Sequence, residues 1–199
     1  MQADIYLSVD RTYSLPDPPL TPRGAQQARD ASNRFTPISD TTTRTTAHTT
    51  SNGLPPPDLI LISPLTRTIQ TALLVFSWSP PLSPSPSPSP SPSPSSTVPE
   101  IQIWPELREC FRHVVCHGSP KSVLERRFEG LGLDFRTCRE SWDDYEAHSA
   151  ENARVRAEAV RSRIRDLVVG ERYRHVVIVT HRGFAAWLVK GEKFETCGE

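Results

Sequence analysis

The sequence predicts an α/β fold, a three-layer sandwich in which helices cover both faces of a mostly parallel central sheet. Residues 58–63 and 176–179 are short apolar runs, rich in branched side chains, that are typical of buried strands. Each is followed by apolar residues at helical spacing, in 64–78 and 184–188. This alternation of strands and helices carries the prediction.

Size and composition set the general class. The 199 residues suffice for a single domain over 1–199, and 23 basic side chains balance 23 acidic ones. The balance gives no reason to expect a nucleic acid or a membrane surface as partner. With no apolar run near the ~20 residues of a membrane span and no signal-peptide core, we expect a soluble cytoplasmic protein. The sequence does not indicate an oligomeric state.

The cysteines predict free thiols. There are four of them, Cys110, Cys116, Cys138 and Cys197. None forms a C-x-x-C pair, and their spacing fits no zinc template even when the nearby His113 and His117 are included. We therefore expect no metal site.

The N-terminal part predicts a strand and a helix. Residues 4–9 alternate apolar and more polar side chains, as a short strand does. A helix follows from about Pro22 to near Phe35, with Thr21 as its N-cap and the proline at its first position.

Two segments are expected to be disordered, low-complexity insertions. Residues 36–57 are rich in Ser, Thr and Pro and almost without apolar side chains, and residues 79–97 are a Ser-Pro repeat. Strands and helices on both sides are needed for one sheet, so neither insertion separates two domains.

Arg67 lies in the first turn of the helix predicted for 64–78. A positive charge there opposes the helix dipole, but it is well placed to meet an anion that the backbone N–H groups attract. The alternative is a surface arginine paired with a carboxylate.

The middle of the chain supplies a third strand at 100–104, followed by Glu106 and Glu109. Either carboxyl group could share a cleft with other strand ends, or be a solvated charge. A helix is predicted over 119–128 with Ser119 as its cap, and an ordered turn at 142–145.

The longest helix is predicted over 149–169. The apolar side chains expected on one face are Val155, Ala159, Ile164, Leu167 and Val168. Its many arginines are expected on the solvated face.

His181 follows the run at 176–179, which we expect to be a central strand covered on both faces. Ligands of open α/β sheets bind at the carboxyl ends of the strands, so this imidazole is a candidate functional residue. The alternative is a histidine that merely caps the following helix.

Four segments together resemble the histidine phosphatase superfamily, the phosphoglycerate mutase-like family. They are DPPLTPRGAQQA at 17–28, DLILISPLTRTIQTA at 58–72, PELRE at 105–109 and HVVIVTHRGF at 175–184. They occur in the family's order, from the N-terminal helix to residue 190.

The resemblance implies a phosphoglycerate mutase-like fold and a phosphatase, a hydrolase that acts on a small phosphorylated metabolite through a phosphohistidine intermediate. Arg67 would bind the phosphoryl oxygens. His181 would be the second histidine of the pocket and would have two roles, one catalytic and one in binding phosphate. Glu109 would protonate the leaving oxygen, with Glu106 as the alternative. The family needs no metal or other cofactor.

The family's nucleophile is missing. It lies in an Arg-His-Gly or Arg-His-Ala triplet at the end of the first strand, but here Arg11 is followed by Thr12 and no histidine precedes His48. The flanks remain family-like, as if a short block had been removed from the gene or from its exon assignment. His48, His113 and His117 are not expected to replace the nucleophile, since attack needs reacting atoms held within ~3–3.5 Å.

Two hypotheses follow. The first is a histidine-phosphatase-type phosphomonoesterase that is inactive in this version of the chain. The second is a pseudoenzyme, a non-catalytic pseudophosphatase that binds phosphate or a phosphorylated ligand.

Overall fold

The sheet is parallel, as predicted. The computed structural model describes residues 15–35, 53–77, 99–143, 148–170 and 172–189. Within them, β1 (Leu59–Ile62), β2 (Glu100–Ile103) and β3 (Val176–Val179) form a sheet in the order β2-β1-β3. The strand predicted for 4–9 and the segments 36–52 and 78–98 lie outside the described residues.

The central strand of the described sheet is β1, not β3. Leu59 pairs with Glu100 on one side and with Val176 on the other, and all four β1 residues are buried. The four residues of β3 are only partly buried, and β3 lies at one edge of the sheet in the described part of the chain. Val177 and Val179 nevertheless pack against one core, and Val176 and Ile178 pack against the other, so 176–179 is covered on both faces as predicted. Only the predicted central position is not found among the described strands, because a continuous apolar run does not reveal the position of a strand in its sheet.

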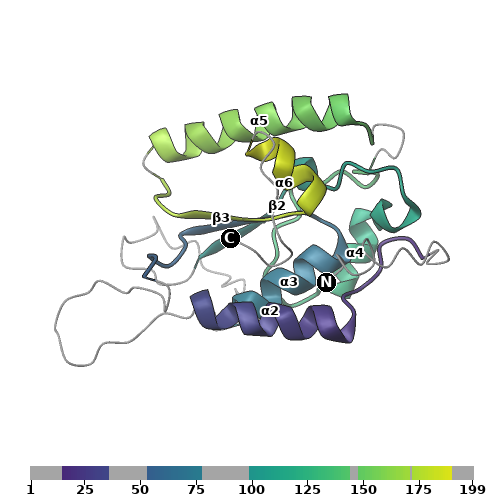
Figure 1. The fold of residues 1–199 in the computed structure, drawn as a ribbon, viewed down its shortest axis with the longest axis horizontal. Coiled ribbons are helices and arrows are strands. Elements are labelled where there is room, and N and C mark those ends of the chain that lie inside the picture. Colours follow the sequence, from purple (N-terminus) through teal and green to yellow (C-terminus); the bar gives the residue numbers. More distant parts are fainter. Residues whose placement is uncertain (1–14, 36–52, 78–98, 144–147, 171, 190–199) are drawn as a thin grey trace.

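Helices cover both faces, which confirms the three-layer α/β architecture (Figure 1). Ile60 and Ile62 face one core with α2 (Pro22–Phe35), α3 (Thr66–Val75) and α4 (Lys121–Arg127). Leu59 and Leu61 face the other core with α5 (Ala150–Val169) and α6 (Arg182–Leu188). Alternate residues of a strand point to opposite faces, so one four-residue strand supplies both cores.

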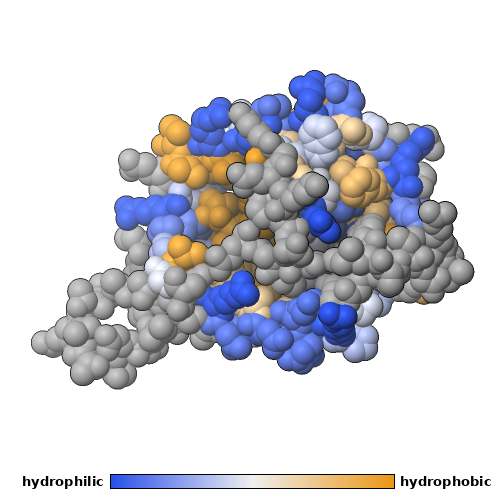
Figure 2. Space-filling view, in the orientation of Figure 1, coloured by the Kyte–Doolittle hydropathy of each residue, from blue (hydrophilic) through white to orange (hydrophobic). Residues whose placement is uncertain are grey.

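The start of α3 is fixed by a residue far away in the sequence. Asp17 accepts hydrogen bonds from the backbone N–H and the hydroxyl of Thr66, both at 2.7 Å, and it forms an ion pair with Arg127 on α4 at 3.3 Å. Thr21 caps α2 by accepting from the Gly24 N–H at 3.1 Å, as predicted. Figure 2 shows hydrophilic side chains along the lower edge of the molecule, where α2 lies.

Ser119 does not cap α4, in contrast to the prediction. The residue at the N-cap is Pro120, and no side chain caps this helix end. The backbone of Ser119 is used instead: its N–H donates to Asp17 at 3.3 Å and its carbonyl accepts from the indole of Trp142 at 2.8 Å. Trp142 packs in the core, as expected of the predicted turn, whose residues 144 and 145 are outside the described part.

The buried face of α5 differs from the predicted one. Ser149 caps the helix through the N–H of Asn152, but the buried residues are Ala153, Arg156, Ala157 and Val160. Val155, Ala159 and Val168 are exposed, and only Ile164 and Leu167 of the predicted set pack against the core. Small alanines let the helix approach the sheet closely. The positions of Val155 and Val168 therefore did not identify the buried face. Figure 2 shows apolar side chains where the C-terminal end of α5 lies.

In the described residues, none of the helices combines the length and the apolar character that crossing a membrane requires.

Candidate active site

The three strands end at the same edge of the sheet, and the predicted site residues follow them there. Ser63 comes directly after β1, and His181 comes two residues after β3. The 3-10 turn η1 (Pro105–Leu107) follows β2, and its Leu107 carbonyl accepts a hydrogen bond from the Thr180 hydroxyl at 2.7 Å. In parallel α/β sheets this edge is where ligands bind.

His181 is not a helix cap. It occupies the N-cap position of α6, but its side chain makes no capping hydrogen bond. Its Nε2 instead lies 2.8 Å from the hydroxyl oxygen of Ser63, and both side chains are buried. Sequence reasoning did not single out Ser63; its position directly after a strand is the signal that could have marked it.

The surroundings of His181 keep its imidazole neutral. Burial is the largest cause, and the positive charges of Arg67, Arg156 and His148 add to it, so the pKa of His181 is well below the ordinary 6.5. A neutral ring near the guanidinium groups of Arg67 and Arg156 is an environment that favours an anionic ligand.

This shift predicts a pH dependence of stability. The unfolded chain takes up the His181 proton near pH 6.5 and the folded chain resists it, so the free energy of unfolding falls as the pH drops below that value. The slope from this residue is at most about 1.4 kcal/mol per pH unit. Denaturant unfolding between about pH 7.5 and pH 5 is expected to show a smaller slope in His181→Gln than in the wild type. The exposed His175 serves as control, and equal slopes in His181→Gln and wild type would contradict the shift.

Arg67 is a buried arginine and not a surface one. Its side chain leaves α3 toward the segment after β2, where Nη1 donates to the Val115 carbonyl at 2.7 Å and Nη2 lies 4.0 Å from the Cys116 sulfur. In the described part of the chain it has no carboxylate partner, so the surface ion pair considered as the alternative is not found there. A buried guanidinium without a counter-charge is suited to a bound anion.

Glu109 is buried against the first turn of α6, whereas the Glu106 side chain is partly exposed. A Cβ added at Gly183 would come within 2.5 Å of Glu109 Oε1, which places this carboxylate against the first turn of α6. Glu109 is 2% exposed, and Oε1 accepts from the backbone N–H of Cys110 at 2.8 Å. The Glu106 side chain is 41% exposed, and its nearest cation is Arg163 on α5 at 3.9 Å. A side chain at position 183 would displace the Glu109 carboxylate and the Phe111 ring, each of which lies 2.5 Å from the position of that Cβ.

Arg156 is a site residue that sequence reasoning missed, since we expected the arginines of α5 in solvent. Its Nη1 donates to the carbonyls of Glu106 and Arg108 at 2.7 and 2.8 Å, which fixes the segment that carries Glu109. The guanidinium also lies 4.5 Å from the centre of the Phe184 ring. Burial, with Arg108 nearby, lowers the pKa of Arg156 to about 10, so it remains charged at neutral pH.

Asp143 joins the segments around the site. It accepts from His148 Nε2 and from the Gly118 N–H, both at 2.7 Å, and Arg108 Nε lies 3.5 Å away. The second ring nitrogen of His148 lies 3.1 Å from the Phe111 carbonyl, so both ring nitrogens face oxygen atoms. Nothing in the sequence pattern marked this pair.

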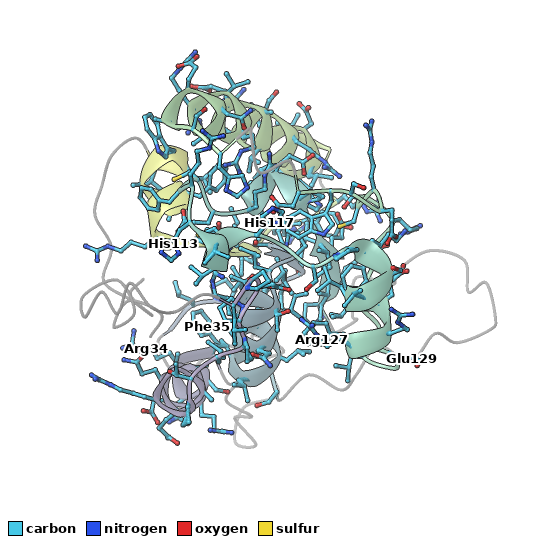
Figure 3. All side chains as sticks on the ribbon, turned by 90° about the vertical axis from the view of Figure 1, so that its right-hand side faces the viewer. Arg34, Phe35, His113, His117, Arg127 and Glu129 are labelled. Carbon is cyan, nitrogen blue, oxygen red and sulfur yellow. The ribbon has the colours of Figure 1, made fainter. Side chains whose placement is uncertain are left out.

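The two histidines considered as alternative nucleophiles lie on one segment after β2 (Figure 3). Nδ1 of His113 accepts from the Val115 N–H at 3.4 Å and caps the turn η2 (Val114–Cys116). His117 is 46% exposed, with Nδ1 at 3.4 Å from Asp143. No hydrogen bond connects either one with Arg67, Glu109 or His181 in the described residues.

The cysteines of the described segments are free thiols, as predicted: Cys110, Cys116 and Cys138. Burial raises the pKa of Cys110 and of Cys138 to about 12. Over the same segments, no three His, Cys, Asp or Glu side chains are grouped so that they could hold a metal ion.

Comparison with known proteins gives matches only among solved structures. No family model matches the chain, and no curated protein does. The chain is similar to a candidate alpha-ribazole-5'-P phosphatase from Escherichia coli str. K-12 substr. MG1655, with 21% identity and a TM-score of 0.43. It is also similar to the alpha-ribazole phosphatase from Shigella flexneri, with 21% identity and a TM-score of 0.41. Each comparison covers 86% of this chain, which spans 65% of the other.

Proposed function

We propose that the chain carries a phosphomonoester site of the histidine phosphatase type, which binds a small phosphorylated metabolite. The observation behind this proposal is the pairing of a buried Arg67 that lacks a carboxylate partner in the described residues with a neutral His181 at the same sheet edge. A phosphomonoester carries two negative charges at neutral pH, and guanidinium and imidazole groups are its ordinary donors in proteins.

The residues divide the work of a phosphatase. Arg67 binds the phosphoryl oxygens, His181 donates a hydrogen bond to the transferring group, and Glu109 protonates the leaving oxygen. In the family, a second histidine attacks phosphorus and water then releases phosphate from the phosphohistidine. No histidine of this sequence precedes His48, so the chain lacks a residue for the attack.

The chain as given is therefore proposed to bind its ligand without turnover. This is the non-catalytic form of the same site, a pseudophosphatase, and the sequence observation favours it over an active enzyme. An active form would need an Arg-His block between the codons for Leu7 and Val9, which genomic and transcript sequencing can detect.

The test uses the full chain with inorganic phosphate and vanadate as ligands. Both are expected to raise the melting temperature, because a ligand that binds only the folded state stabilises it. Hydrolysis of p-nitrophenyl phosphate is expected to stay at the level of a protein-free control. An unchanged melting temperature at millimolar phosphate would refute binding. Hydrolysis above background that persists in His181→Ala would refute the assignment of the pocket.

A further inference from the structure

The contact between Ser63 and His181 joins two rigid positions. The backbone N–H of Ser63 donates to the Val179 carbonyl at 3.0 Å, and the Ser63 carbonyl accepts from the Thr68 hydroxyl at 2.9 Å. Ser63 is fully buried, and its hydroxyl oxygen lies 2.8 Å from Nε2 of His181. The Ser63 hydroxyl is therefore held against Nε2 of the imidazole ring.

A neutral imidazole carries one hydrogen, on Nδ1 or on Nε2, and the partner of one nitrogen decides the role of the other. A serine hydroxyl can donate to a bare Nε2 or accept from a protonated one. Nδ1 of His181 has no hydrogen-bond partner in the described part of the chain, so it is the nitrogen left for a ligand.

The surroundings of the ring favour an anionic ligand, and such a ligand can use only one of the two tautomers. Arg67, Arg156 and His148 place positive charge at His181, and Glu109 lies against the neighbouring Gly183. A phosphoryl oxygen accepts hydrogen bonds and cannot donate one, so Nδ1 can contact it favourably only when Nδ1 carries the proton. Nε2 then carries no hydrogen and accepts a hydrogen bond. The Ser63 hydroxyl, 2.8 Å away, can donate it.

We propose that Ser63 is a positioning residue that fixes the Nδ1–H tautomer of His181 by donating its hydroxyl hydrogen to Nε2. The donor at Nδ1 is then set before a phosphoryl group arrives, and no proton has to move on binding. The tautomer itself is a property of the ligand-free chain; its use in phosphate binding rests on the proposed function.

Long-range ¹H–¹⁵N NMR of the histidine-labelled full chain reads the tautomer directly, with His181→Gln to assign the signal. The wild type is expected to show Nδ1–H at neutral pH. Ser63→Ala is expected to lose this selection and show Nε2–H or a mixture. Ser63→Thr keeps the hydroxyl and is expected to retain Nδ1–H. Ser122→Ala, in an exposed serine on α4, is the control for losing a hydroxyl.

A phosphate titration of the same variants separates the two proposals. Ser63→Ala is expected to weaken phosphate binding about three- to ten-fold, the effect of losing one neutral hydrogen bond. An Nε2–H ring in the wild type, or Nδ1–H retained in Ser63→Ala, overturns the role of Ser63 even if phosphate binds. If Nδ1–H is found in the wild type and lost in Ser63→Ala, but the chain does not bind phosphate, the role of Ser63 is supported and the proposed function is refuted. Should Ser63→Ala fail to fold, the wild-type tautomer alone decides.

Discussion

Replacing Arg67 with alanine is expected to abolish the stabilisation by phosphate and vanadate. Arg67 is a buried guanidinium that has no carboxylate partner in the described residues, and it adds positive charge to the surroundings of His181. A hydrogen bond to a charged group contributes about 1.5–3 kcal/mol, so the affinity for phosphate is expected to fall about 10- to 100-fold or more. Isothermal titration calorimetry with inorganic phosphate measures this loss.

Two variants frame the experiment. Arg67→Lys keeps the charge but not the planar fork, so an intermediate affinity is expected. Arg136→Ala removes the same charge from a side chain that is 85% exposed and paired with Asp134, and it is expected to leave phosphate binding unchanged. Circular dichroism checks that Arg67→Ala still folds, since Nη1 also supports the Val115 carbonyl. Wild-type affinity in a folded Arg67→Ala chain would exclude Arg67 from the pocket.

Replacing Asp143 with alanine is expected to cause a large loss of stability. Burial alone would raise the pKa of this carboxyl group, but the hydrogen bonds from His148 and the Gly118 N–H, with the charges of His148 and Arg108, outweigh it and hold the pKa below its usual 3.8. Removing one partner of a buried charge cluster leaves the others uncompensated, at a cost of about 3–5 kcal/mol. For a chain of this size that corresponds to a melting temperature lower by about 6–20 °C.

Urea unfolding measures the change in the free energy of unfolding directly. Asp143→Asn preserves the shape and can still accept from Gly118, so a smaller loss is expected. Glu125→Ala removes a carboxylate from an exposed pair with Lys121 and is expected to change the free energy by less than about 1 kcal/mol. A loss in Asp143→Ala no larger than in Glu125→Ala would show that the cluster contributes nothing to stability.

The described strands can be predicted from the sequence because β1 and β3 are short apolar runs that lead into a polar turn, and because β2 alternates polar and apolar residues. Their place in the sheet cannot be predicted, since β1 and β3 are both runs of branched apolar residues but differ in burial. On α5, hydrophobicity misleads because the N-terminal half of the packed face is built from two alanines and an arginine that reaches backbone carbonyls, with Val160 as its buried large apolar residue. The side-chain size that fits between a helix and a sheet depends on the distance between them, and the periodicity of the sequence does not give this distance.

The site was predictable to the extent that its residues follow strands directly. Arg67, Glu109 and His181 stand in recognisable motifs near strand ends, and the structure brings all three to one edge. Ser63 stood in one of these motifs without being singled out. Arg156 does not follow a strand, and its role depends on hydrogen bonds to residues about 50 positions away. The Asp143–His148 pair does not follow a strand either, and it lies in a segment whose sequence has no periodicity.

The Ser63–His181 contact joins residues 118 positions apart, and Arg67 reaches Val115 across 48. Closing such long loops is entropically costly, so contacts of this kind are slow to form during folding. A partly folded chain that has formed only its local helices and turns therefore lacks the phosphate site. A phosphate ester that occupies the finished site would act on the unfolding rate and leave the folding rate unchanged, because it has nothing to bind before the barrier is crossed.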